Sequence, residues 1–262
     1  MRFLDNVMTD FINRAPDEFA HAKYSAMRER SVGLGVMGFH SFLQKNSIPF
    51  ESVMSKSWNN KIFKHIQTQV DEASKLLSEE KGACPDAQEY GFKERFSNKT
   101  AIAPTASISI ICGGASPGVE PVAANSYTHK TLSGSYNVRN RYLNKVLEKY
   151  KRNDEETWSS ITTNQGSVEH LDFLNQKWII ELGADRTPYI SQAQSINIFL
   201  PADVHKKELH QIHFQAWKKG LKSLYYCRSK SIQRAENVNN EVKINKNNTA
   251  EDEKYEECLS CQ

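Results

Sequence analysis

The most constraining feature of this sequence is a strand–helix–strand pattern close to its C-terminal end. Residues 195–200, Ser-Ile-Asn-Ile-Phe-Leu, alternate as a strand does. Asp203 can then cap a helix that runs through Trp217 and stops at Gly220, and residues 221–227 have the composition of a second strand. Because right-handed crossovers of this kind build parallel sheets or barrels, the pattern predicts an α/β fold.

Two amphipathic helices are expected in the first third of the chain. Apolar side chains recur every three or four positions over residues 3–12, which places them on one face that needs a covering partner. A longer helix is expected over residues 57–80, with Gly82 as its stop. Between them, Gly33-Leu-Gly-Val-Met-Gly38 has the glycine spacing of a dinucleotide loop, but the charged residues 21–30 before it look helical and not extended. We therefore favour close helix packing through small residues over a nucleotide cradle.

Charge and cysteine content restrict the class of protein. The chain carries 34 Lys and Arg against 31 Asp and Glu, a formal net charge of +3, and has no basic run that would favour nucleic acid. No segment approaches the roughly 20 apolar residues of a membrane span, and the start lacks the apolar core of a secretory signal. Five cysteines at uneven spacing make a poor disulfide framework. These features predict a protein of the reducing cytoplasm.

The last 34 residues differ in composition from the rest of the chain. They contain six Asn and no Gly, Pro, Phe or Trp, so too little apolar surface exists there to offset the entropy of ordering. We expect a folded part over residues 1–228 and a flexible tail over residues 229–262. The tail ends in Cys258-Leu-Ser-Cys261, whose thiols can close a disulfide and be reopened by exchange. Spacing alone also allows half of a zinc site or an incidental pair.

A segment rich in small and hydroxylated residues follows Pro104 at the expected end of a strand. This segment, Thr105-Ala-Ser-Ile-Ser109, exposes successive backbone N–H groups and hydroxyls that suit an anion. The same residues can instead form a buried turn that satisfies its own backbone. The residues alone do not decide between the two interpretations.

Adjacent tyrosines, Tyr225 and Tyr226, lie in the last expected strand. Core packing is the default for such a pair, and regular pleating would send the two rings to opposite faces of a sheet. The remaining residues that could react or bind a metal are expected to be structural, as small buried thiols or as part of a helix surface. They are Cys84, Cys112, Cys227, His210 and His213.

Four segments, in this order along the chain, together resemble the C-terminal part of the large (α) subunit of class I aerobic ribonucleotide reductase. They are Arg30–Gly38, Ala103–Ser109 with Pro117–Pro121, Leu221–Tyr226 and the terminal CxxC. The resemblance implies the C-terminal half of a ten-stranded α/β barrel. It also implies an enzyme that reduces ribonucleoside diphosphates to 2′-deoxyribonucleoside diphosphates through a thiyl radical.

The resemblance also implies residue roles. Tyr225 and Tyr226 would relay a radical, which requires a twist or an end-of-strand position so that both rings face one path. Cys258 and Cys261 would re-reduce the active-site disulfide. The loop that holds the substrate's phosphates would consist of Pro104, Thr105, Ala106, Ser107, Ile108 and Ser109.

The implied partners are a small radical-bearing subunit, thioredoxin or glutaredoxin, and the N-terminal part of the large subunit. No metal or other cofactor is expected on this chain, since the radical comes from a metal cofactor in the small subunit and the nucleotide effectors bind the N-terminal part. The family's radical cysteine and its two reducing active-site cysteines lie upstream of the equivalent of Met1. The chain therefore looks like one polypeptide of a split large subunit, inactive alone.

Two alternatives come from other classes of protein. A stand-alone thiol–disulfide oxidoreductase would use the CxxC, but it would place that motif at the start of a helix in a compact fold. A noncatalytic anion-binding assembly protein would need the Thr105–Ser109 loop, but neither the tyrosines nor the tail.

Overall fold

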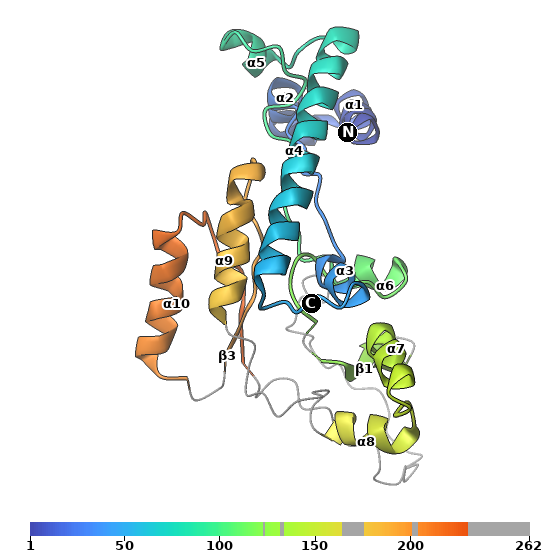
Figure 1. Ribbon diagram of the computed structural model, residues 1–262. Helices are drawn as coiled ribbons and strands as arrows, with labels where there is room; N and C mark the ends of the chain where they lie inside the picture. Colours follow the sequence, from blue (N-terminus) through green and yellow to red (C-terminus); the bar gives the residue numbers. More distant parts are fainter. Residues whose placement is uncertain (123, 132–133, 164–175, 201–203, 230–262) are drawn as a thin grey trace, which may run out of the picture.

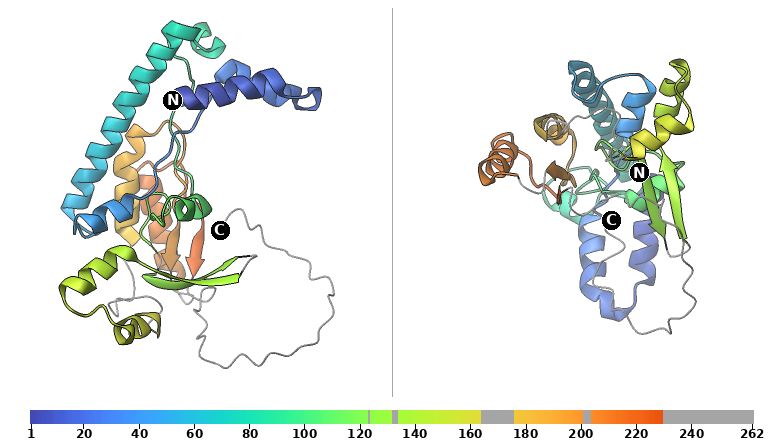
Figure 2. Two further views of the ribbon diagram at one scale, coloured as in Figure 1. Left: turned by 90° about the vertical axis from the view of Figure 1, so that its right-hand side faces the viewer. Right: turned by 90° about the horizontal axis from the view of Figure 1, so that it is seen from below.

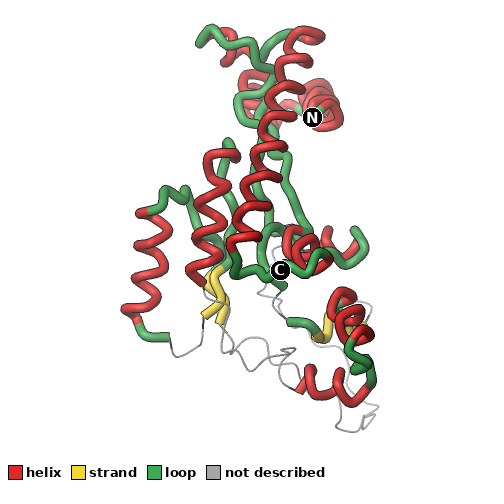
Figure 3. The backbone as a smooth tube through the Cα atoms, in the orientation of Figure 1, coloured by secondary structure: helices red, strands yellow, loops and turns green. Residues whose placement is uncertain are grey.

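Helices dominate the protein, and its strands are short (Figure 3). The structure is a computed structural model that describes residues 1–122, 124–131, 134–163, 176–200 and 204–229. Of the tail expected over residues 229–262, Ser229 belongs to a strand, and residues 230–262 lie outside the described residues. Within the described part, no helix combines the length and hydrophobicity needed to cross a bilayer.

The long helix α4 (Val53–Lys81) runs through most of the height of the molecule (Figure 1). The Ser52 hydroxyl caps its start by accepting the N–H of Ser55. Gly82 ends it with φ +85°, a left-handed conformation that favours glycine. The helix expected here is therefore confirmed, although it starts earlier than residue 57.

The strand–helix–strand pattern forms the parallel unit that was expected. Strands β3 (Ile198–Leu200) and β4 (Cys227–Ser229) pair in parallel, with α10 (Lys206–Lys218) between them in sequence. Two details differ from the expectation. The second strand begins at Cys227, not at residue 221, and the His205 ring caps α10 by accepting the N–H of Lys207. Asp203, the expected cap, lies outside the described residues.

Backbone hydrogen bonds extend this pair into a row of four parallel segments. Leu34 bridges Thr100 and Ile102 bridges Gln194, both in parallel. The third segment then continues into β3, where Tyr225 N–H donates to Ile196 O at 2.8 Å. Residues 32–34, 98–102, 193–198 and 225–229 therefore lie side by side. This row is the parallel β layer predicted for the C-terminal half of an α/β barrel.

Close approach between the first two segments explains two glycines of the Gly33–Gly38 motif. A Cβ on Gly35 would lie 2.7 Å from the carbonyl oxygen of Ala101, and one on Gly33 would lie 3.0 Å from the Ala101 Cβ. The small residues thus allow packing, as predicted, but against an extended segment and not against a helix.

The main core lies where three helices cover this β layer. They are α3 (Phe39–Lys45), α4 and α9 (Gln176–Arg186), and α10 packs beside α9 over β3 (Figure 1). Each stacked helix contributes an apolar stripe, so burial of these stripes stabilises the barrel half. The most deeply buried core side chains include Phe39, Leu43, Phe63, Ile179, Ile180, Leu182, Ile196 and Ile198.

At the far end of α4 the chain forms a small helical group. It consists of α1 (Arg2–Arg14), the short helix η1 (Asp17–Phe19), α2 (Ala20–Glu29) and α5 (Pro85–Glu89), and α1 projects sideways in Figure 2. One side of α1 packs through Met1, Leu4 and Met8. The neighbouring part of the same apolar face, with Phe3, Val7 and Phe11, stays exposed.

A buried carboxylate, Asp5, anchors α1 to the rest of the protein. Its oxygens accept hydrogen bonds from Arg30, Arg95 and Lys81, which come from three different parts of the chain. Burial acts to raise the pKa of Asp5, but these bonds outweigh it and lower the pKa to about 2. The carboxylate therefore stays ionised and links four segments.

The remaining elements lie beside and below the barrel half. Helix α6 (Ala106–Ile111) follows the second parallel segment, and the short helix η2 (Thr187–Tyr189) follows α9. An antiparallel hairpin of β1 (Ser126–Thr131) and β2 (Gly134–Arg139) was not expected from the sequence. Helices α7 (Arg141–Lys149) and α8 (Glu155–Thr163) follow it.

Candidate functional site

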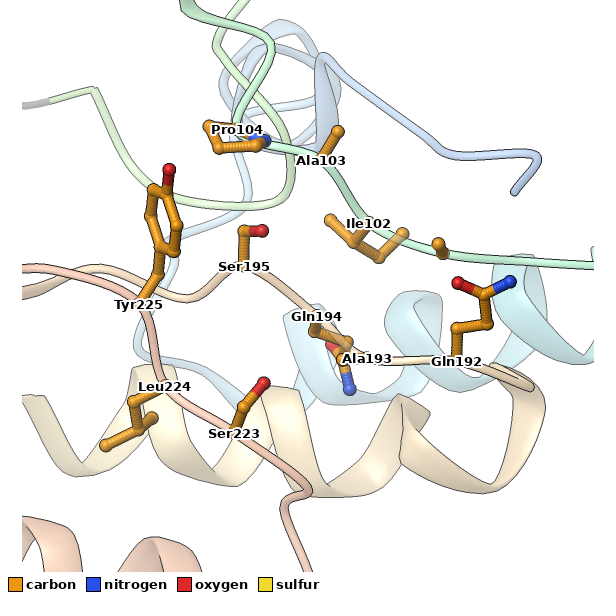
Figure 4. A pocket seen from close by; sticks show the side chains of 11 residues that line it. Ile102, Ala103, Pro104, Gln192, Ala193, Gln194, Ser195, Ser223, Leu224 and Tyr225 are labelled. Carbon is orange, nitrogen blue, oxygen red and sulfur yellow. The ribbon is translucent and has the colours of Figure 1, made fainter. Parts of the chain in front are cut away.

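A cavity of about 300 Å³ lies between three of the parallel segments (Figure 4). Residues 101–104 form one wall, residues 192–195 the second and residues 223–225 the third. Two groups that the sequence singled out separately, Pro104 and Tyr225, therefore line one cavity. In Figure 4 the Tyr225 ring rises beside Pro104, with its hydroxyl directed to that side of the cavity.

The rings of Tyr225 and Tyr226 contact each other directly before β4. Their ring centroids are 4.1 Å apart at an interplanar angle of 54°. Regular pleating would separate them, but the segment has not yet entered the strand, so the end-of-strand position expected for a relay is confirmed. The rings are 40% and 42% exposed, so the expectation of core packing is wrong.

Backbone bonds on both sides hold this aromatic pair against β3. The N–H of Tyr225 donates to Ile196 O, and the carbonyl of Tyr226 accepts the N–H of Ile198, both at 2.8 Å. The tyrosines are therefore fixed through their main chain while their rings stay accessible.

The Thr105–Ser109 segment forms the start of α6 and not an open loop. Thr105, at φ +55°, precedes the helix, and its hydroxyl accepts the N–H of Gly118 at 2.8 Å. The Ser109 hydroxyl is buried and donates to the carbonyl of Ala106 at 2.8 Å. Ser107 is exposed in the first turn, where helix N–H groups have no partner within the helix. Thr105 and Ser109 therefore satisfy the turn, as the structural interpretation predicts. Anion binding at Ser107 stays a prediction.

The other cysteines and histidines correct some expectations. Cys84 is buried as expected, but Cys112 and Cys227 are exposed, because one ends the short helix α6 and the other begins β4, whose other edge has no strand among the described residues. His210 and His213 lie on the exposed surface of α10, as expected. The described residues contain no group of three or more His, Cys, Asp or Glu that could hold a metal. Cys258 and Cys261 lie outside the described residues.

A half-buried histidine, His40, was not singled out by the sequence. Its Nδ1 accepts the N–H of Val122 at 3.0 Å. Desolvation by burial lowers the pKa of His40 to about 4, so the ring is neutral at physiological pH. Its role here is structural.

The sequence also did not reveal a buried polar network behind the cavity. The Arg186 guanidinium is 1% exposed and donates to Gln194 Oε1 at 2.6 Å and to Asn59 Oδ1 at 2.9 Å. Burial lowers its pKa to about 9, against the opposing effect of the nearby Glu120 carboxylate. Glu120 in turn binds Asn197. Of the residues in this network, the sequence motifs contained only Glu120, which lies within Pro117–Pro121.

Comparison with known proteins agrees with this architecture. The family described as ribonucleotide reductase, barrel domain, matches residues 1–95 and 86–227. The chain belongs to this family. The expected fold class, half of the reductase-type α/β barrel, is therefore confirmed.

Several ribonucleoside-diphosphate reductase large subunits are similar to the chain. That of Invertebrate iridescent virus 6 is 44% identical over 263 residues, covering 94% of this chain and 27% of the relative. That of Invertebrate iridescent virus 3 is 38% identical, covering 99% of this chain and 43% of the relative. The class Id ribonucleotide reductase alpha subunit of Actinobacillus ureae superposes with a TM-score of 0.78 at 37% identity, covering 87% of this chain and 45% of that one. The chain thus spans less than half the length of these ribonucleotide reductase relatives.

Proposed function

We propose that this chain acts as the C-terminal part of the large subunit of a ribonucleoside-diphosphate reductase. In this role it contributes substrate-phosphate binding, radical transfer and disulfide re-reduction to the formation of 2′-deoxyribonucleoside diphosphates. The observation that carries the proposal is the contacting ring pair Tyr225–Tyr226, one member of which lines the cavity beside Pro104.

The chemistry of tyrosine explains why such a pair suits radical transfer. Tyrosine is oxidised by losing an electron and a proton, so a hydrogen-atom equivalent can pass between two phenols in contact. Rings 4.1 Å apart are close enough for this step, and their partial exposure leaves one side open to an incoming partner. That partner would be a small subunit whose metal cofactor generates the radical.

The cavity and α6 supply the proposed substrate site. A ribonucleoside diphosphate would place its phosphates at the first turn of α6, where the N–H groups after Thr105 and the Ser107 hydroxyl can donate to phosphate oxygens. The sugar would then lie towards the cavity, near Tyr225.

The other functions of the enzyme require groups outside the described residues. Cys258 and Cys261 would carry reducing equivalents from thioredoxin or glutaredoxin to the active site. The radical cysteine and the nucleotide-effector sites would belong to the large-subunit portion that the relatives have and this chain does not cover. We place the assembled enzyme in the cytoplasm, and we expect it to bind no nucleic acid.

Reconstitution tests the proposal directly. Cytidine diphosphate reduction should be undetectable with the purified chain alone and should arise when the N-terminal portion of the large subunit and the small subunit are both added. Turnover by the chain alone would contradict the proposal, as would its absence from a complex shown to assemble. Catalytic thiol–disulfide exchange by the chain, without nucleotide reduction in an assembled complex, would instead favour a stand-alone oxidoreductase.

Replacing Ser107 by Glu tests the phosphate site. In the reconstituted enzyme the added carboxylate should repel the diphosphate, and we expect the substrate KM to rise about 10- to 100-fold, as one like charge in a partly desolvated site can cost some 1–3 kcal/mol. Ser107→Ala should have a much smaller effect. Ser109 is not suitable for this test, because its buried hydroxyl is bonded within α6.

Ile111→Glu is the matched control for this measurement. It adds the same charge to an exposed position at the other end of α6, so the substrate KM should stay within about twofold of the starting protein. An unchanged KM for the folded Ser107→Glu variant would make the segment purely structural.

A further inference from the structure

The backbone of Tyr226 is held by a buried side chain from the third parallel segment. The N–H of Tyr226 donates to Oδ1 of Asn197 at 3.2 Å. Asn197 is 7% exposed and lies directly before β3. This side-chain bond adds to the main-chain bonds of Tyr225 with Ile196 and of Tyr226 with Ile198.

Glu120 determines how Asn197 is oriented. The Asn197 side-chain Nδ2 donates to Glu120 Oε2 at 2.9 Å, and the backbone N–H of Asn197 donates to Glu120 Oε1. A carboxylate can only accept, so the amide nitrogen must face Glu120 and the amide oxygen must face Tyr226. The three residues therefore form a directed chain of hydrogen bonds.

The charge of Glu120 is balanced inside the protein. The carboxylate is 8% exposed, and the buried Arg186 guanidinium is close enough to interact with it electrostatically. A buried carboxylate that accepts two hydrogen bonds and faces a buried cation keeps its orientation, because any rotation would leave unpaired buried groups.

We propose that Glu120 and Asn197 are positioning residues that hold Tyr226 in ring contact with Tyr225. The proposal rests on the function proposed above. Because Tyr225 lines the cavity, the radical reaches it from Tyr226: the Tyr225 O–H bond breaks, an O–H bond forms on Tyr226, and one electron and one proton pass between them. The oxidant is the radical of the small subunit.

Exchanging the amide and the carboxylate tests this assignment in the reconstituted enzyme. In Glu120→Gln the new amide nitrogen faces either the backbone N–H or the side-chain amide nitrogen of Asn197, so one of the two hydrogen bonds is lost. In Asn197→Asp two carboxylates face each other, so each single variant weakens the link. The double variant Glu120→Gln/Asn197→Asp reverses the pair: the Gln amide donates to Asp, and Asp still accepts from Tyr226. It also keeps one negative charge near Arg186.

The expected result is a kcat effect that the exchange repairs. Each single variant should lower kcat at least about tenfold with the substrate KM within about twofold, since misplacement by about 1 Å can cost a hundredfold. The double variant should return to within about threefold of the original kcat. Hydrogen exchange of the Tyr226 amide should be faster in the single variants and slow again in the double variant.

Ser74→Ala provides the matched control for stability. Ser74 is fully buried and accepts the N–H of Arg95 near the far end of α4, so its loss weakens a buried hydrogen bond away from the tyrosines. It should lower the thermal midpoint but leave kcat unchanged.

The outcomes separate this proposal from the proposed function. Folded single variants with unchanged kcat, in an enzyme that Tyr226→Phe inactivates, would overturn the positioning role alone. Turnover by Tyr226→Phe would overturn the radical relay. Slow hydrogen exchange of the Tyr226 amide in both single variants would overturn the hydrogen-bond link. If a single variant does not fold, the double variant decides: restored turnover supports the proposal, and lost turnover or lost folding overturns it.

Discussion

Deoxyribonucleotide formation by the reconstituted enzyme should fall to background when either Tyr225 or Tyr226 is replaced by Phe. Phe keeps the ring and hence the stacking at 4.1 Å, but it cannot lose the phenolic proton with an electron. Substrate binding should be unchanged, because neither substitution alters the α6 turn. The measurements are turnover of a ribonucleoside diphosphate and its equilibrium binding to the same preparation.

Stability should change little in these two variants. Both rings are partly exposed, so removing a hydroxyl should cost about 1 kcal/mol or less of unfolding free energy. Tyr90→Phe is the matched control, since Tyr90 is exposed beside α5, far from the cavity, and this variant should retain full activity. Substantial turnover by Tyr225→Phe or Tyr226→Phe would argue that the aromatic pair serves packing.

Replacing Cys258 and Cys261 together by Ser should abolish multiple turnover with a protein reductant. If the pair only re-reduces the active site, a pre-reduced enzyme should still complete about one turnover per site, because the chemical step does not use these thiols. A small dithiol should partly restore steady-state turnover by reaching the active site directly. The measurement compares burst amplitude with steady-state rate under thioredoxin and under dithiothreitol.

The exposed Cys112 offers a control for this double variant. Cys112→Ser removes a solvent-accessible thiol without touching the CxxC, so burst amplitude and steady-state rate should both be retained. Full thioredoxin-dependent turnover by the Cys258→Ser/Cys261→Ser variant would show that another reductant path serves the enzyme.

Local patterns in the sequence predicted the elements that depend on near neighbours. The stripe and the glycine stop predicted α4, and the alternation after residue 195 predicted the parallel pair β3–β4. The cap of α10 was assigned to the wrong residue, because Asp203 and His205 are both able to accept an N–H at a helix start and only the local backbone path selects one. The hairpin β1–β2 was missed for a different reason: its strands carry few apolar residues, so no alternating pattern marks them.

The candidate site was predicted in its members but not in its arrangement. The resemblance singled out Pro104, Ser107 and the tyrosine pair from two separate motifs, and the structure brings Pro104 and Tyr225 to one cavity. The exposure of the two tyrosines could not be predicted, because an aromatic pair in a strand is usually buried. It depends on where β4 begins relative to them.

The sequence by itself determined the long helix α4, the parallel crossover through α10 and the family, because periodicity, glycine stops and motif order depend on residues close together in the chain. Only the tertiary structure decided which polar residues are buried. Asn197 meets Glu120 across 77 positions, Arg186 meets Asn59 across 127, and Arg95 meets Asp5 across 90. Burial of such groups is tolerated only when distant partners satisfy them, so their identity depends on how the whole chain folds.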